Sequence, residues 1–292
     1  MSVSTIHDIG YRHYEGRRLG RAYMTRSLYL HNLRAAYGLG RPARAKVMPF
    51  LLAAIMLLPA AGSVAAFALT KEAETLMRYA SYAPTLQAII AIFMATQAPV
   101  LASRELRFHV IPLYFSRPVG HLDFVLAKLG AMVTALFALM AVPITVLYAG
   151  GLVTSAPDPG EQLVRFLTAL VGCALYALVL GAIGLVVAAF TPRRGFGVAA
   201  VIAVYLVTAA FVAIIQGLAE MESNWSLAGW AGLFAPFNLV DIVQVRLLGA
   251  QSSSIAIAPG LPGGLVALAM CLGLAAGSVA VLYARFRKAG LS

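Results

Sequence analysis

The chain has 292 residues, of which 61% are hydrophobic and 11% are charged, and its formal net charge is +11. Roughly a quarter of the residues of a typical soluble domain are charged, so this composition excludes a soluble globular protein with an ordinary polar surface.

Six long apolar segments predict membrane-spanning helices. A helix of about 20 apolar residues crosses the hydrocarbon core of a bilayer and satisfies its own backbone hydrogen bonds there. We therefore expect an all-α polytopic membrane protein with six transmembrane helices. The segments contain no formally charged side chain and span residues 48–70, 85–102, 129–153, 166–190, 198–218 and 261–284.

Basic residues are concentrated in one set of the segments that flank these spans. Residues 1–46, 103–128, 191–197 and 285–292 contain 18 Lys and Arg residues, and the segments on the opposite side contain only 4. This asymmetry predicts a multi-pass protein of the cytoplasmic membrane with both termini in the cytoplasm. Anionic lipid of the inner leaflet accounts for the net charge better than a nucleic acid does.

The N-terminal segment mixes aromatic and basic residues and contains no proline between residues 19 and 37. This composition predicts an amphipathic helix that lies in the headgroup layer. The alternative is a solvated basic tail. Gly38, Gly40 and Pro42 are expected to end the helix before the first span. We assign residues 1–46 to a cytoplasmic or interfacial region and residues 47–292 to the six-helix transmembrane domain.

The inner connection of residues 103–128 is the most informative segment. An exposed apolar group with charges of both signs around it suits a docking element for a soluble partner, since the apolar group fills a pocket and the charges set the register. The alternative is a loop that folds onto the lipid headgroups. The residues expected to dock are Arg104, Glu105, Arg107, Leu113, Tyr114, Phe115, Ser116, Arg117, Pro118 and Asp123.

The outer segment before the last span is long and apolar. Within it, residues 230–248 include Pro236, Asp241 and Arg246. A charge at mid-bilayer costs about 3 kcal/mol, so a seventh crossing is not expected. We predict a short helix over residues 236–248, with proline in its first turn and Gly249 after its end. It either re-enters the membrane region or lies on the outer surface.

Polar and aromatic side chains in the apolar part of the chain could line a path for an amphipathic substrate. The alternative is that they hydrogen-bond neighbouring helices. The candidates for this path are Gln97, Tyr205, Gln216, Phe237 and Asn238.

Several catalytic motifs are absent from the sequence. It contains no GxxxxGK[ST] phosphate loop, no HExxH and no GxSxG. His109 and His121 share one connection without further metal ligands, and Cys173 and Cys271 are expected to be packing residues. We expect no catalytic activity from this chain by itself, no metal site and no bound cofactor.

Residues 103–128 resemble the loop between the second and third spans of ABC-2-type transporter permeases. The similar residues are the acidic and basic pair Arg104–Glu105, the "LYLSRP"-like centre Leu113–Pro118, and Lys128 at the start of the next span. The six spans, the basic N-terminal segment and the outer segment before the last span match the layout of the family. The sequences "RPARAK" and "LYFSRP" are most similar to the corresponding segments of actinobacterial members of the family.

The resemblance implies an ATP-driven exporter whose ATPase is a separate subunit. Two permease copies, identical or different, would pair with two ATPase copies, which bind ATP and Mg. The 103–128 loop would be the coupling helix and the N-terminal helix the elbow helix. The substrate would be hydrophobic or amphipathic, such as a drug, a lipid, a peptide or a glycan.

Two other classes remain open. A non-transporting membrane scaffold or sensor could hold a cytoplasmic partner with the same loop. An integral membrane enzyme that modifies lipid would need convergent acid, base or metal groups at membrane depth, and the sequence displays none.

Overall fold

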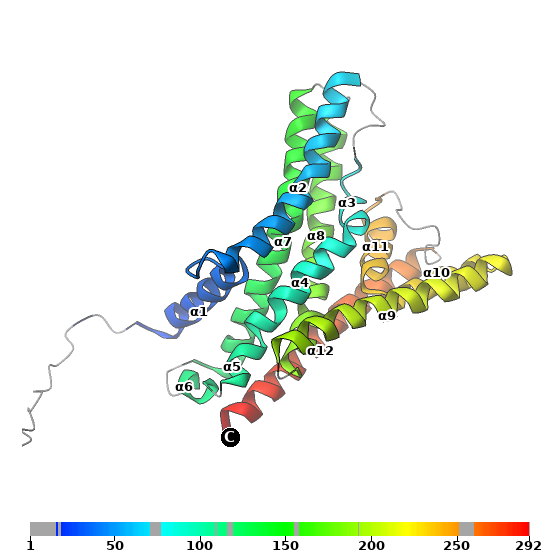
Figure 1. Cartoon of the computed structure of the whole chain (residues 1–292). Coiled ribbons are helices and arrows are strands. Elements are labelled where there is room, and N and C mark those ends of the chain that lie inside the picture. The colour runs from blue at the N-terminus through cyan, green and yellow to red at the C-terminus, as the bar shows by residue number, and fades with distance from the viewer. Residues whose placement is uncertain are drawn as a thin grey trace, which may run out of the picture.

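A computed structural model describes residues 16, 19–70, 77–108, 110–115, 119–154, 158–191, 193–250 and 260–291. In these ranges all regular structure is helical, and six helices are long and apolar enough to cross a membrane, so the predicted all-α membrane protein is confirmed (Figure 1).

The six long helices are joined by short helical elements. Five of the long helices are α2 (Arg44–Thr70), α7 (His121–Val153), α8 (Pro159–Ala189), α9 (Arg194–Met221) and α12 (Gly260–Leu291). The sixth is the segment Gln87–Arg107, in which α4 (Gln87–Leu101) is continued by α5. The short elements are α1 (Arg21–Ala36), α3 (Tyr82–Thr85), α5 (Ser103–Arg107), α6 (Ile111–Phe115), α10 (Trp225–Ala231), the 3₁₀ turn η2 (Gly232–Phe234) and α11 (Pro236–Leu247).

Three long helices form the packed centre and three lie at the periphery. In their most apolar stretches, 61% of the α4–α5 segment and 56% of both α7 and α8 is buried, against 22% of α2, 17% of α9 and 28% of α12. Figure 1 shows α9 sloping away from the upright helices α2, α7 and α8. Apolar faces that would be costly in water carry no such penalty in lipid, so the exposed faces of α2, α9 and α12 suit a membrane.

Side-chain contacts show that the long helices alternate in direction. At one end, Ser103 donates from Oγ to the carbonyl of Ala188 at 2.6 Å. At the other end, Tyr79 donates from its hydroxyl to Gln162 Oε1 at 3.4 Å, and the Met77 amide donates to Ser63 Oγ at 2.7 Å.

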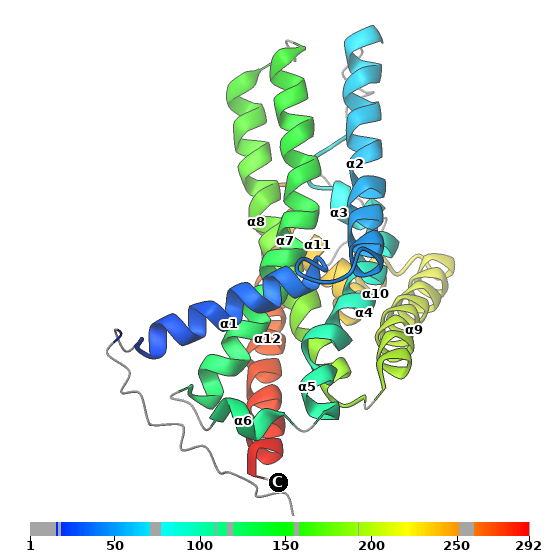
Figure 2. The same ribbon diagram turned by 60° about the vertical axis from the view of Figure 1, so that its left-hand side comes forward.

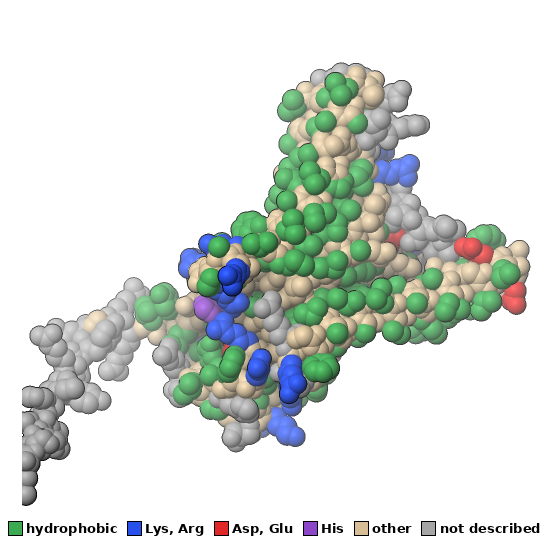
Figure 3. All heavy atoms as spheres, viewed as in Figure 1, with side chains coloured by type: hydrophobic (Ala, Val, Ile, Leu, Met, Phe, Trp, Pro, Cys, Tyr) green, Lys and Arg blue, Asp and Glu red, His purple; other side chains and the backbone are tan. Residues whose placement is uncertain are grey.

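The basic segments of the described chain share the end of the bundle at which Ser103 meets Ala188, and we call this end the basic end. Figure 3 shows Lys and Arg side chains gathered around α1 and the start of α2, with apolar side chains over α9.

The helices continue beyond the apolar segments. The third span was expected over residues 129–153, whereas α7 begins at His121, and α12 continues to Leu291. Backbone hydrogen bonds extend a helix into the headgroup layer and into water, so the apolar run predicts only the part inside hydrocarbon.

The predicted short helix before the last span is confirmed as α11, with Pro236 in its first turn and Gly249 at a φ of 68° after its end. Of the two alternatives left open, a plain surface helix does not fit the burial of α11. Asp241 and Gln244 are 3% and 2% exposed, and α11 packs against α8 and α12. The helical segment Trp225–Phe234, which precedes α11, meets it at an angle of 119°. The two helices together therefore bend back within the bundle.

Candidate functional site

At the basic end, residues 103–128 do not form one helix within a loop. They fold as α5, α6 and the first turns of α7, so Asp123 and Lys128 belong to α7. The amides of Phe108 and Val110 bond to the carbonyls of Arg104 and Glu105, which closes α5. The predicted docking residues Ser116, Arg117 and Pro118 lie outside the described residues, as does His109.

An aromatic cluster joins α6 to α7 and α12. Phe115 stacks on His121 with ring centroids 4.0 Å apart, and Tyr114 lies 5.3 Å from Phe124. Phe124 lies 5.2 Å from Phe286 of α12. Offset and edge-to-face aromatic pairs contribute beyond their buried area, by about 1 kcal/mol each. We call these five residues the aromatic cluster.

The expected exposure of the apolar triplet is therefore only partly correct. Leu113 is 68% exposed, whereas Tyr114 and Phe115 are half-buried in the aromatic cluster. Because successive side chains of one helical turn point about 100° apart, α6 can pack two aromatic residues inward and still present Leu113 outward.

A buried ion pair lies beside the aromatic cluster. Lys128 is only 1% exposed; its ammonium pairs with Glu105 and donates to the carbonyl of Leu101. The ammonium also lies 4.9 Å from the centre of the Phe124 ring, in cation–π geometry. The side chain of Glu105, one of the residues expected to dock a partner, is only 13% exposed, and its pair with Lys128 joins α5 to α7.

The residues that remain exposed form a basic and apolar surface. Arg104 and Arg107 are exposed on α5, and Phe108 and Leu113 are 62% and 68% exposed. We call these four residues the docking face. Such a surface suits a partner with acidic groups around an apolar pocket.

Helix α1 is attached along the first half of α7, as Figure 2 shows. Arg21 pairs with Asp123, and the hydrogen bond to that carboxylate raises the pKa of the Arg21 guanidinium. The Arg21 side chain is 65% exposed, so this pair contributes little to stability.

The firmer attachments of α1 are two tyrosine hydroxyls. Tyr29 donates to Thr134 Oγ1 at 2.9 Å and Tyr37 to the carbonyl of Ala135 at 2.8 Å. Burial raises the pKa of Tyr37 to about 12. The predicted N-terminal helix therefore exists, and the structure packs it on the bundle through Leu28 and Ala36.

Four of the five residues considered for a substrate path lie near one another, and Gln97 lies apart from them. A Cβ on Gly232 would be 3.6 Å from Asn238 Cβ and 3.9 Å from the side-chain nitrogen of Gln216. Tyr205 of α9 and Phe237 of α11 lie together, with ring centroids 6.0 Å apart, and Asn238, which follows Phe237, is half-buried. Tyr205 donates to the carbonyl of Leu180 at 3.3 Å. Gln216 donates to the carbonyl of Ala228 at 3.2 Å, and Gln97 lies toward the basic end. The polar atoms of Tyr205 and Gln216 thus bond neighbouring helices, which is the alternative the sequence left open.

Sequence reasoning missed the contribution of the last helix to the basic end. Arg285 donates from Nε to the carbonyl of Ala189 at 3.4 Å and lies 5.4 Å from the ring of Phe190, so it caps the C-terminus of α8. Phe286 completes the aromatic cluster. One sequence pattern could have indicated this contribution: Tyr283 and Phe286 are three residues apart, a spacing that places both on one face of α12.

The described residues contain no group of three or more His, Cys, Asp or Glu side chains that could hold a metal ion. Cys173 and Cys271 are buried and free. Compared with protein-family models and with curated proteins, the chain matches none of them.

Proposed function

We propose that this chain is the transmembrane permease subunit of an ATP-driven ABC exporter in the cytoplasmic membrane, with its basic end in the cytoplasm. A separate ATPase subunit binds ATP and Mg, and two permease copies work with two ATPase copies. The cargo is a hydrophobic or amphipathic compound.

The observation that carries this proposal is the two-sided construction of α5 and α6. Their outer side is the docking face, with Leu113 at 68% exposure. Their inner side is tied to α7 by the Lys128–Glu105 pair and to α12 by Phe115, whose ring lies so close to Gly290 that a Cβ there would be 2.7 Å from it. Packed interiors transmit displacement rather than absorb it, so a partner that pushes on the docking face moves two long helices together.

This construction suits the conversion of nucleotide binding into motion. A partner that changes shape with ATP favours whichever membrane conformation its bound surface fits better. Helix α1, attached through Tyr29 and Tyr37, moves with α7 as part of the same unit.

Purification in mild detergent tests the docking face. Leu113→Asp combined with Arg104→Glu and Arg107→Glu is expected to abolish copurification of the ATPase, because it replaces an apolar and basic surface with an acidic one. The matched control is Leu19→Asp with Arg26→Glu and Arg34→Glu, which makes the same charge change at exposed residues outside α5 and α6. Equal recovery of the ATPase with both triple variants would refute the docking assignment.

A second variant separates docking from transmission. Tyr114→Ala with Phe115→Ala leaves the docking face intact but removes two members of the aromatic cluster. The ATPase is expected to copurify with this variant, whereas stimulation of its ATP hydrolysis by the permease is lost. Stimulation at the level of the unaltered protein would show that the aromatic cluster does not transmit the coupling.

A further inference from the structure

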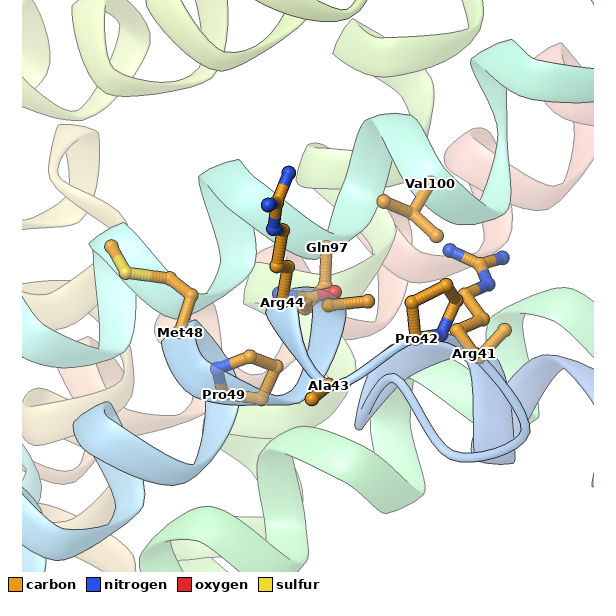
Figure 4. A pocket seen from close by; sticks show the side chains of 10 residues that line it. Arg41, Pro42, Ala43, Arg44, Met48, Pro49, Gln97 and Val100 are labelled. Atoms are coloured by element: carbon orange, nitrogen blue, oxygen red, sulfur yellow. The ribbon is translucent and has the colours of Figure 1, made fainter.

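A pocket of about 680 Å³ lies where the chain turns from α1 into α2 and faces α4 (Figure 4). Arg41, Arg44 and Met48 line it from the turn and from α2, and Gln97 and Val100 line it from α4. Its volume is in the range of pockets that hold small organic ligands.

The turn that forms this pocket has a defined conformation. Gly38 has a φ of 67°, a conformation that side chains with a Cβ rarely adopt, and a Cβ there would overlap the carbonyl of Ala45. The Leu39 amide bonds the carbonyl of Arg34 at 2.8 Å, and the Ala45 amide bonds that of Pro42 at 2.9 Å. The bend is held by backbone contacts, so the pocket exists before any ligand binds.

The rim of the pocket is cationic. Arg41 is half-buried and Arg44 is exposed, and the described residues that line the pocket include no acidic one. Figure 4 shows the two guanidinium groups on different sides of Gln97, whose buried amide lies between them in the view. Two guanidinium groups on one rim favour an anion with several acceptor oxygens, such as a phosphate.

The rest of the wall is apolar. Met48 and Pro49 are the first residues of the first apolar segment, and Val100 faces them from α4. The pocket therefore crosses the boundary between the basic headgroup layer and the hydrocarbon, which suits a ligand with an anionic head and an apolar body.

We propose that this pocket binds an anionic phospholipid of the leaflet at the basic end, with its phosphate near Arg41 and Arg44 and its acyl chains along Met48 and Val100. The inference goes beyond the proposed function and does not depend on the ATPase partner. It requires only the cationic pocket at the membrane boundary.

Native mass spectrometry of the purified full chain tests the site, with phosphatidylglycerol as the probe and phosphatidylcholine as the neutral comparison. Arg41→Gln with Arg44→Gln is expected to weaken phosphatidylglycerol binding by about 30-fold, since each basic side chain near an anionic surface contributes about a factor of five. Phosphatidylcholine is expected to bind weakly to both proteins.

Arg26→Gln with Arg34→Gln is the matched control. These arginines line a smaller hollow of about 330 Å³ whose described lining residues all belong to α1. Their substitution removes the same charge at the same end. Phosphatidylglycerol binding to this control is expected to stay within about twofold of that of the unaltered protein, because general surface charge makes only a weak, screened contribution. An equal loss in the two double variants would mean that charge alone, and not the pocket, binds the lipid.

A third variant tests the shape of the pocket while both arginines are retained. Ala43→Trp places a bulky side chain at an exposed lining position, so it fills the pocket without disturbing the core. It is expected to weaken phosphatidylglycerol binding as strongly as the loss of both arginines. Unchanged binding to this variant would overturn the proposal.

Inorganic phosphate distinguishes a lipid headgroup from a free anion. It has no acyl chains, so it is expected not to displace phosphatidylglycerol at millimolar concentration. Displacement by phosphate would identify the ligand as a soluble anion and overturn the assignment to lipid.

Discussion

At the scale of single residues, Lys128 shows how a charge is accommodated at the packed basic end. Its ammonium has a carboxylate partner in Glu105, a carbonyl in Leu101 and the ring of Phe124 at 4.9 Å. Removing one member of a buried ion pair costs more than removing both, because the remaining charge keeps its desolvation penalty without its partner.

Lys128→Met is expected to lower the free energy of unfolding by about 3 kcal/mol, because it leaves the Glu105 carboxylate without its partner. Glu105→Gln with Lys128→Met is expected to recover part of that loss. The measurement is the thermal unfolding midpoint of the purified protein in detergent. Equal midpoints for the single and the double variant would show that the two side chains are not coupled.

At the scale of elements, the position of α11 depends on a glycine in α8. A Cβ on Gly172 would overlap the side-chain amide of Gln244, so the Gln244 side chain of α11 packs directly on the α8 backbone in the space that glycine leaves. Since neighbouring residues of α11 are buried as well, the Gln244 side chain has little room to move.

Gly172→Ala is expected to destabilise the protein by about 2 kcal/mol, because overpacking forces α11 or Gln244 to shift. Gly273→Ala is the control, since a Cβ on Gly273 of α12 would have no atom within 4 Å. Alanine at that position is expected to be neutral or stabilising, because it favours the helix. Thermal unfolding of both variants measures the difference, and Gly172→Ala with Gln244→Ala should recover stability. Similar midpoints for Gly172→Ala and Gly273→Ala would contradict the close packing of α11.

The ends of several elements were predictable from local sequence. Gly38 and Gly40 follow α1, and Pro236 and Gly249 bracket α11, because proline and glycine impose backbone conformations regardless of the surrounding fold. The burial of α11 was not predictable, because its composition matches both an interfacial helix and an inserted one. Its environment depends on Gly172 and Gly264, which belong to other helices.

At the scale of the whole molecule, the alternating helices place exposed positions at two opposite ends. Leu113 is 68% exposed at the basic end, and Met221 is 85% exposed at the far end of α9. The native cysteines are buried, so a single introduced cysteine can be labelled with little background.

Labelling of intact cells with a membrane-impermeant maleimide tests the orientation of the chain. Met221→Cys is expected to react in intact cells, and Leu113→Cys only after the membrane is permeabilised, because the basic end is expected to face the cytoplasm. The control is the unaltered chain, whose reaction measures the background from Cys173 and Cys271. Labelling of Leu113→Cys in intact cells would show that the basic end faces outward. It would then contradict the proposed docking to a cytoplasmic ATPase.

The six helices that are long and apolar enough to cross a membrane, their approximate positions and the concentration of basic charge at one end follow from the sequence alone. They are consequences of local composition, because hydrophobic length and charge act residue by residue in a bilayer. The tertiary structure decided that Tyr114 and Phe115 pack inward while Leu113 stays exposed, and that Glu105 pairs with Lys128. It also decided that Arg41 and Arg44 share a pocket with Gln97. These features depend on contacts between segments distant in the chain, and no local pattern specifies which side chains will meet.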